Sequence, residues 1–342
     1  MTHVQLTLWA GFAVGVIFGI AAQRSRFCFT GGLREWWGEG NPRRAGALFV
    51  ALATALLGTQ LLALYAVVDL EPSLYLTSTF SWLLIPVGGV LFGIGMMLAR
   101  SCGSRALVLL ASGNLRSLLV FFCLGVSAGI ALTGPLATWR LNIADLTAVT
   151  LPHASLAQWT GADAVGFDAA RLALTLIIAL VLLGLGIFRL RLFRYPADII
   201  AAVIVGLTIV AGWWVTGHLG ADDFEPVPLE SLTFVAPISD ALQYLMLASG
   251  MRAGFALTVI AGILLGAGIT ALAAREFRWQ GFESPTQMRR AIIGGFLMGV
   301  GGALAMGCTV GQGLTGLSTL SISSILAVTG ILSGARLGLR WA

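Results

Sequence analysis

Long apolar runs recur along this whole chain, and they constrain its fold more than any other feature. Of the 342 residues, 58% are hydrophobic and only 10% are charged, against about 25% charged residues in soluble domains. A helix needs about 20 residues to cross a bilayer, so the runs at 7–22, 82–99, 292–306 and 322–335 are short for a crossing. The full set of runs lies at 7–22, 46–68, 82–99, 117–133, 172–188, 198–217, 255–272, 292–306 and 322–335.

These runs predict an all-α, polytopic membrane protein with about nine full-length helices plus short helices that span incompletely. No soluble domain fits between the runs, and the net charge of +5 offers no basic domain face for nucleic acid. The first apolar run lacks a basic segment before it, so we expect it to be retained as a helix and not cleaved as a signal peptide.

The distribution of arginine predicts the orientation in the membrane. Segments 24–44, 100–116, 189–195 and 275–290 are rich in arginine, so we expect them to be cytoplasmic. Segments 69–80 and 217–234 contain no lysine or arginine and are expected to be external. The amino terminus is then outside.

An internal repeat is the most specific signal in the sequence. The segments "FGIAAQRSRFCFTGG", "FGIGMMLARSCGSRA" and "MGVGGALAMGCTVGQ" align without gaps, and in each a cysteine follows nine residues after a glycine. Few other side chains agree among the copies. The glycines are Gly19, Gly93 and Gly299, and the cysteines are Cys28, Cys102 and Cys308.

A fourth, degenerate copy is predicted in "LGAGITALAAREFRW", where Arg275 stands nine residues after Gly266 in place of cysteine. Two copies then precede the segment near 134–170 and two follow it. The sequence therefore predicts two pseudo-symmetric repeat halves, 1–150 and 170–342, which together make one transmembrane domain. Such repeats are common in transporters whose pathway lies at the repeat interface.

The repeat also predicts where a pathway lies. Each copy ends a short apolar run in glycine-rich, polar sequence: "TGG", "GSR" or "TVGQG". A helix break at membrane depth is tolerated only where protein or a water-filled cavity satisfies the freed backbone groups. The glycines upstream of each cysteine are better explained by close helix packing. The three cysteines are therefore candidates to line a substrate pathway.

A thiol in such a position is a soft, weakly polar group suited to sulfur. We expect no metal and no cofactor, since there is no Cys-x2-Cys pair and His3, His153 and His218 fall in predicted external segments. The fourth cysteine, Cys123, lies outside the repeat register and is expected to be a core residue.

Polar and cationic side chains cluster around the motifs and are candidates to bind an anion. Guanidinium groups bind oxyanions through paired donors, and hydroxyl and amide groups can add hydrogen bonds. Anchoring at the cytoplasmic surface explains the arginines equally well. The candidates are Arg24, Arg26, Thr30, Arg100, Ser104, Arg105, Thr309 and Gln312.

At these residues the chain resembles a known family. "SRFCFTGG", "LARSCGSRALV" and "GGFLMGVGGALAMGCTVGQGLTG" are similar to the YeeE/YedE family of bacterial inner-membrane proteins over essentially the whole chain. The resemblance implies uptake of thiosulfate or a related inorganic sulfur anion through an hourglass-shaped helical protein. It also implies that Cys28, Cys102 and Cys308 relay the ligand by S–H···S hydrogen bonds, and that a separate cytosolic sulfur carrier of the TusA type is a partner.

Three alternatives stay open at this point. A passive channel for small anions or sulfide would not depend on the thiols, and some members of the family are linked to selenium compounds. A membrane redox enzyme would use the thiols with a quinone or a disulfide partner, although no resolving cysteine lies close in sequence. No nucleotide-binding loop is present. We expect a transporter and not an enzyme.

Overall fold

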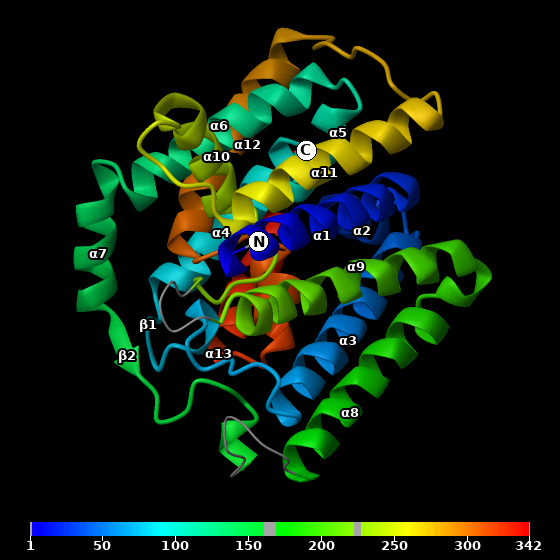
Figure 1. Ribbon diagram of the computed structural model, residues 1–342. Helices are drawn as coiled ribbons and strands as arrows, with labels where there is room; N and C mark the ends of the chain where they lie inside the picture. Colours follow the sequence, from blue (N-terminus) through cyan, green and yellow to red (C-terminus); the bar gives the residue numbers. More distant parts are fainter. Residues whose placement is uncertain (1, 161–168, 222–226, 342) are drawn as a thin grey trace.

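The chain is mostly helical in the computed structural model, which describes residues 2–160, 169–221 and 227–341. Its helices pack into a single bundle (Figure 1). The helices are α1 (His3–Ser25), α2 (Phe29–Gly38), α3 (Arg43–Leu64), α4 (Leu84–Leu98), α5 (Gly103–Ala111), α6 (Leu115–Leu132), α7 (Leu136–Leu146), α8 (Ala169–Gly184), α9 (Pro196–Trp214), α10 (Val235–Leu247), α11 (Phe255–Ala273), α12 (Pro285–Leu304) and α13 (Ile322–Gly338).

Short segments complete the secondary structure of the described residues. The strands β1 (Thr79–Ser81) and β2 (Ala148–Thr150) pair antiparallel at the edge of the bundle (Figure 1). Three single-turn 3-10 segments and three π-helical segments extend or connect the helices. They are η1 (Leu74–Leu76), η2 (Gln158–Thr160), η3 (Leu185–Arg189), η4 (Leu192–Arg194), η5 (Val215–Leu219) and η6 (Gly311–Gly316).

Seven segments of the described chain are long and apolar enough to cross a membrane, which identifies a multi-pass membrane protein. Four of them are composite: His3–Gly38 joins α1 to α2, Leu84–Ala111 joins α4 to α5, Ala169–Arg189 joins α8 to η3, and Pro196–Leu219 joins α9 to η5. The expected count of nine full-length helices stays a prediction. Helix α1 has 23 residues and is longer than the apolar run at 7–22. The difference arises because Thr2 caps the helix start, so that the polar residues before the apolar run are also helical.

Helices from the two predicted halves interleave. Helix α1 packs along α11, α3 along α9, and α4 along both α12 and α13, while α6 packs on α12. Figure 1 shows α1 beside α11 and α3 beside α9. Segments far apart in the sequence therefore contribute to one shared core.

The glycines of the repeat lie in these close helix contacts. A Cβ atom added to Gly19 of α1 would lie 2.6 Å from the carbonyl oxygen of Ile263 in α11. Gly93 of α4 faces the backbone of α13 at Ile331, and Gly299 of α12 faces the backbone of α6. The interpretation of these glycines as packing residues is confirmed.

The helices of the three cysteine-containing repeats all end in the same way. Arg26 (φ 52°), Arg100 (φ 53°) and Met306 (φ 56°) adopt left-handed backbone conformations two positions before the cysteines. That conformation is unfavourable for residues other than glycine, but it turns the chain sharply at the end of α1, α4 and α12. Each cysteine is thereby placed at the start of a new helical segment.

Helix α11 also ends on a left-handed residue, Arg275 (φ 57°). Arg275 therefore corresponds to Arg26 and Arg100, and Phe277 stands at the cysteine position. The register predicted from Gly266 is wrong by two residues, because the helix end, and not the upstream glycine, marks the equivalent position in this copy.

We predict that Gly19→Ala destabilises the protein, because the new methyl group would collide with the backbone of α11. Overpacking of this kind costs about 1–3 kcal/mol, so the midpoint of thermal unfolding in detergent should fall. Gly38→Ala is the matched control, since a Cβ at Gly38 meets nothing within 4 Å. An unchanged midpoint for Gly19→Ala would contradict the packing.

Candidate functional site

Three of the four cysteines lie buried where one helix has ended and another segment begins. Cys28 precedes α2, Cys102 precedes α5, and Cys308 lies between α12 and η6. Their relative exposures are 7%, 0% and 1%. The fourth, Cys123, is half-buried on α6, where its Cβ faces Gly295 of α12.

The structure brings the three buried thiols together. The side chains of Cys28 and Cys102 lie within hydrogen-bonding reach of each other. Cys308 lies within electrostatic range of Cys102. Cys102 therefore occupies the middle of a series, and we call the three residues the cysteine cluster.

Backbone N–H groups at the starts of short helices point into this cluster. The Sγ atom of Cys28 accepts from Gly31 N at 3.3 Å, and the Sγ atom of Cys308 accepts from Gly311 N at 3.2 Å. The Cys102 thiol lies 3.3 Å from the Ser104 hydroxyl. The start of a helix carries free donors and a partial positive charge, so these ends favour an anion.

Four of the predicted anion-binding side chains keep an unpaired polar atom here. They are Thr30 Oγ1, Thr309 Oγ1, Gln312 Oε1 and Arg105 Nη1, none of which has a nitrogen or oxygen partner among the described residues. A buried polar group without a partner costs about 1–3 kcal/mol, and such groups indicate an unfilled role such as ligand binding.

The contacts of Thr309 and Arg105 tie these two side chains to the cluster. Thr309 lies against the Cys102 thiol, and the charge of Arg105 acts on both Cys28 and Cys102. Gln312 is held by its amide nitrogen, which donates to the carbonyl oxygens of residues 305 and 306 at 2.8 and 3.1 Å. Its amide oxygen has no partner in the described part of the chain.

A basic cavity of about 530 Å³ opens beside Arg105, and we call it the arginine vestibule. Among the described residues that line it, Glu276 is the only acidic one, and it pairs with Arg26 at 3.4 Å. The lining arginines come from both halves of the chain, and all lie in predicted cytoplasmic segments. They are Arg26, Arg44, Arg105, Arg275 and Arg278.

Arg44 lies between the vestibule and the Cys28 thiol. A Cβ atom added to Gly31 would lie 3.1 Å from the Nη1 atom of Arg44 and 3.7 Å from the Sγ atom of Cys28. The Arg44 guanidinium and the Cys28 thiol therefore approach the same point. The guanidinium pairs with Glu35 at 2.8 Å. Sequence reasoning missed Arg44, because it stands outside the aligned repeat segments. It also passed over Arg278, which lies in the degenerate copy, where no cysteine marks a site.

Two of the predicted arginines lie away from the cysteine cluster. Arg24 is exposed and lines a groove between α1 and α9 together with Asp198. Arg100 is exposed and lines a separate cavity with Arg116 and Arg290. Neighbouring positions on a helix end diverge in direction, so a charge close in sequence to a cysteine need not be close in space.

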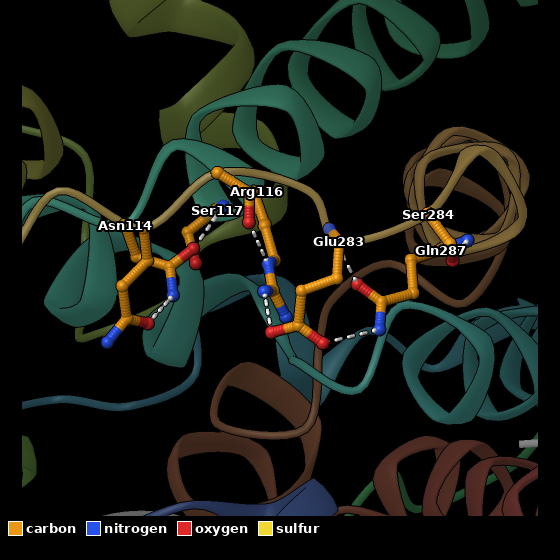
Figure 2. Close-up of polar contacts among 8 residues, drawn as sticks. Asn114, Arg116, Ser117, Glu283, Ser284 and Gln287 are labelled. Atoms are coloured by element: carbon orange, nitrogen blue, oxygen red, sulfur yellow. Dashed lines mark hydrogen bonds and ion pairs between the residues drawn. The ribbon is translucent and has the colours of Figure 1, made fainter.

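A clasp of polar contacts, drawn in Figure 2, includes Asn114, which lines both the arginine vestibule and the Arg100 cavity. Asn114 Nδ2 donates to Gln280 Oε1 at 2.9 Å, and Arg116 pairs with Glu283 at 2.6 Å. Arg116 also donates to the carbonyl oxygen of Gly281. These contacts fasten the loop between α11 and α12 to the turn between α5 and α6.

Aromatic and hydroxyl groups cover the opposite side of the cluster. Phe234 N lies in hydrogen-bonding contact with Cys308, and the Tyr75 hydroxyl contacts Thr233. Tyr75 packs edge-on against Trp213, with ring centroids 6.2 Å apart. Tyr75, Thr233 and Phe234 belong to predicted external segments, so we expect Cys308 to lie toward the external side and Cys28 toward the cytoplasmic side.

Comparison with known proteins finds similarity over most of the chain. A family profile described as "Sulphur transport" matches residues 24–337. The thiosulfate transporter TsuA of Escherichia coli K12 is 27% identical over 89% of this chain and 86% of its own length. TsuA of Spirochaeta thermophila is 26% identical over 94% of both chains. The probable transporter YedE of E. coli is 31% identical over 30% of this chain and 23% of its own length.

We predict that Cys28 contributes to stability as the N-cap of α2, separately from any transport role. Cys28→Ala removes the acceptor for Gly31 N and should cost about 0.5–2 kcal/mol, whereas Cys28→Ser keeps an acceptor and should unfold at a higher temperature than Cys28→Ala. Cys123→Ala is the comparison, because Cys123 lies in the interior of α6 and not at a helix start. Equal thermal midpoints for Cys28→Ala and Cys28→Ser would contradict the capping role.

Proposed function

This chain belongs to the sulphur transport family, and we propose that it takes up thiosulfate or a related inorganic sulfur anion across the bacterial inner membrane. Its relatives over most of its length are thiosulfate transporters by name. The proposed pathway passes the cysteine cluster. One observation carries the proposal: three thiols from distant segments meet in the interior beside unpaired donors and a basic cavity.

The chemistry of the cluster fits an anion with one soft and one hard end. Thiosulfate carries a terminal sulfur and three oxygens. The thiols of Cys28, Cys102 and Cys308 suit the terminal sulfur, while the hydroxyls of Thr30 and Thr309 supply donors for the oxygens. A relay of S–H···S hydrogen bonds requires neutral thiols, since a thiolate would repel the anion and offers no donor.

The contacts and the predicted orientation together support one order for the proposed relay. The anion meets Cys308 first from the external side, passes to Cys102, and then reaches Cys28. Arg105 and the arginine vestibule receive it on the cytoplasmic side, where opposite charge offsets the loss of hydration. A separate cytosolic carrier of the TusA type would collect sulfur at this vestibule.

The architecture behind this pathway is part of the proposal. We infer two repeat halves, 1–150 and 170–342, with about nine full-length helices and short segments that meet at the cluster. In transporters built from repeats, broken helices place their starts at the substrate site. The positions of α2, α5 and η6 support this arrangement.

The principal prediction concerns the three thiols. Cys28→Ala, Cys102→Ala and Cys308→Ala should each lose most uptake of labelled thiosulfate in cells that lack other sulfur importers, because each breaks the series. Cys123→Ala should retain uptake, because Cys123 lies outside the cluster. A passive channel for small anions or sulfide would tolerate all three changes. If selenium oxyanions competed with thiosulfate for uptake, the protein would be a transporter of selenium compounds.

A second prediction concerns the unpaired hydroxyls. Thr309→Val keeps the shape of the side chain and removes a hydroxyl that has no nitrogen or oxygen partner among the described residues and contacts the Cys102 thiol, so the thermal midpoint should change little. A hydrogen bond to a charged ligand contributes about 1.5–3 kcal/mol, so half-saturation of uptake should need about 10- to 150-fold more thiosulfate. Ser333→Ala, on an exposed face of α13, is the control. Unchanged half-saturation in Thr309→Val would remove this hydroxyl from the binding site.

A further inference from the structure

A second cavity lies at the other end of α1 and α11 from the arginine vestibule. It has a volume of about 380 Å³ and is lined by the first turns of α1 and α11, by Arg252 and by Glu230. The vestibule, in contrast, is lined by Gln23 and Arg275, at the far ends of the same two helices. The two cavities therefore face opposite sides of the membrane, and the predicted orientation puts the Glu230 cavity outside.

Glu230 begins a buried segment that leads from this cavity to the cysteine cluster. Its backbone is fixed by Thr216, whose hydroxyl donates to the Glu230 carbonyl oxygen at 2.7 Å. Two residues on, Leu232 O accepts from the Thr315 hydroxyl at 2.7 Å, and Phe234 N contacts the Cys308 thiol. The chain from Glu230 to Phe234 thus spans the distance between the cavity and the first thiol of the relay.

The charges that face Glu230 come from three elements. Asp240 of α10 and Arg252 before α11 lie nearby, and the charge of Glu230 reaches Tyr75 beside Cys308. The carboxylate accepts from the backbone N–H of Ala256 at the start of α11. Arg252 is not an isolated charge beside Glu230, because it takes part in a further interaction of its own.

We propose that Glu230 is a proton-binding site on the route of the anion, and that only its neutral form admits a doubly charged sulfur anion to Cys308. This inference rests on the proposed function. A carboxylate at the mouth of a narrow route repels an approaching dianion, and a bound proton removes that repulsion. The proton comes from external water and returns to water when the carboxyl ionises again.

The environment of Glu230 supports protonation in the physiological range. Burial raises the pKa of this carboxyl to about 7, and the neighbouring Asp240 adds to the increase, while the Ala256 N–H opposes it. Below this pKa the side chain is neutral, and above it the side chain is charged. Uptake should therefore rise as the pH falls through about 7.

The test measures uptake of labelled thiosulfate into membrane vesicles buffered to the same pH on both faces, so that no pH gradient drives transport. About one unit above its pKa a carboxyl is neutral in about a tenth of molecules, so wild-type uptake at about pH 8 should be about a tenth of that at about pH 6. Glu230→Gln should take up thiosulfate at the higher pH about as fast as wild type does at the lower pH. Thiosulfate itself keeps both charges over this range.

Asp240→Asn is the matched variant. It removes the charge that helps to raise the pKa of Glu230, so its uptake should keep the pH dependence with a midpoint at lower pH. This shift also tests the proposal if Glu230→Gln does not fold, which thermal unfolding in detergent would reveal. Wild-type uptake that is equal at the two pH values, or Glu230→Gln uptake that still falls at the higher one, would overturn the proton site. Absence of wild-type uptake at every pH would instead overturn the proposed function.

Discussion

Free backbone donors inside a membrane are the constraint on which this structure depends. A helix that starts within the bilayer leaves N–H groups without partners, and lipid cannot supply any. The chain places three such helix starts together. Sulfur atoms accept from some of the free N–H groups, since Cys28 accepts from Gly31 and Cys308 accepts from Gly311. Unpaired hydroxyls remain close to these starts, so the centre of the bundle favours an anion.

Much of the fold can be predicted from the sequence, because hydropathy and the repeat both report on local physics. Apolar runs identify segments that must avoid water, and the glycines at positions 19, 93 and 299 mark close helix contacts that the structure contains. Hydropathy underestimates the length of α1, because polar residues at its start continue the helix beyond the apolar run. The upstream glycine places the fourth repeat two residues out of register, because it is a weaker marker than the left-handed residue that ends each helix.

The candidate site is only partly accessible to the same reasoning. Cysteines in a shared register can be grouped from sequence alone, and the structure does bring them together. The arginines cannot be sorted in this way, since the direction of a side chain at a helix end depends on the turn that follows. Arg105 reaches the cluster while Arg100 lies in another cavity. Tyr75 and Arg44 carry no motif, and only the packing of distant segments places them beside the thiols.

The clasp drawn in Figure 2 has a mechanical consequence. It ties the turn at Asn114 to the loop at Gln280 through a backbone bridge, an amide pair and the Arg116–Glu283 ion pair. Asn114 and Gln280 both line the arginine vestibule, so we expect these two segments of its wall to move together as one unit.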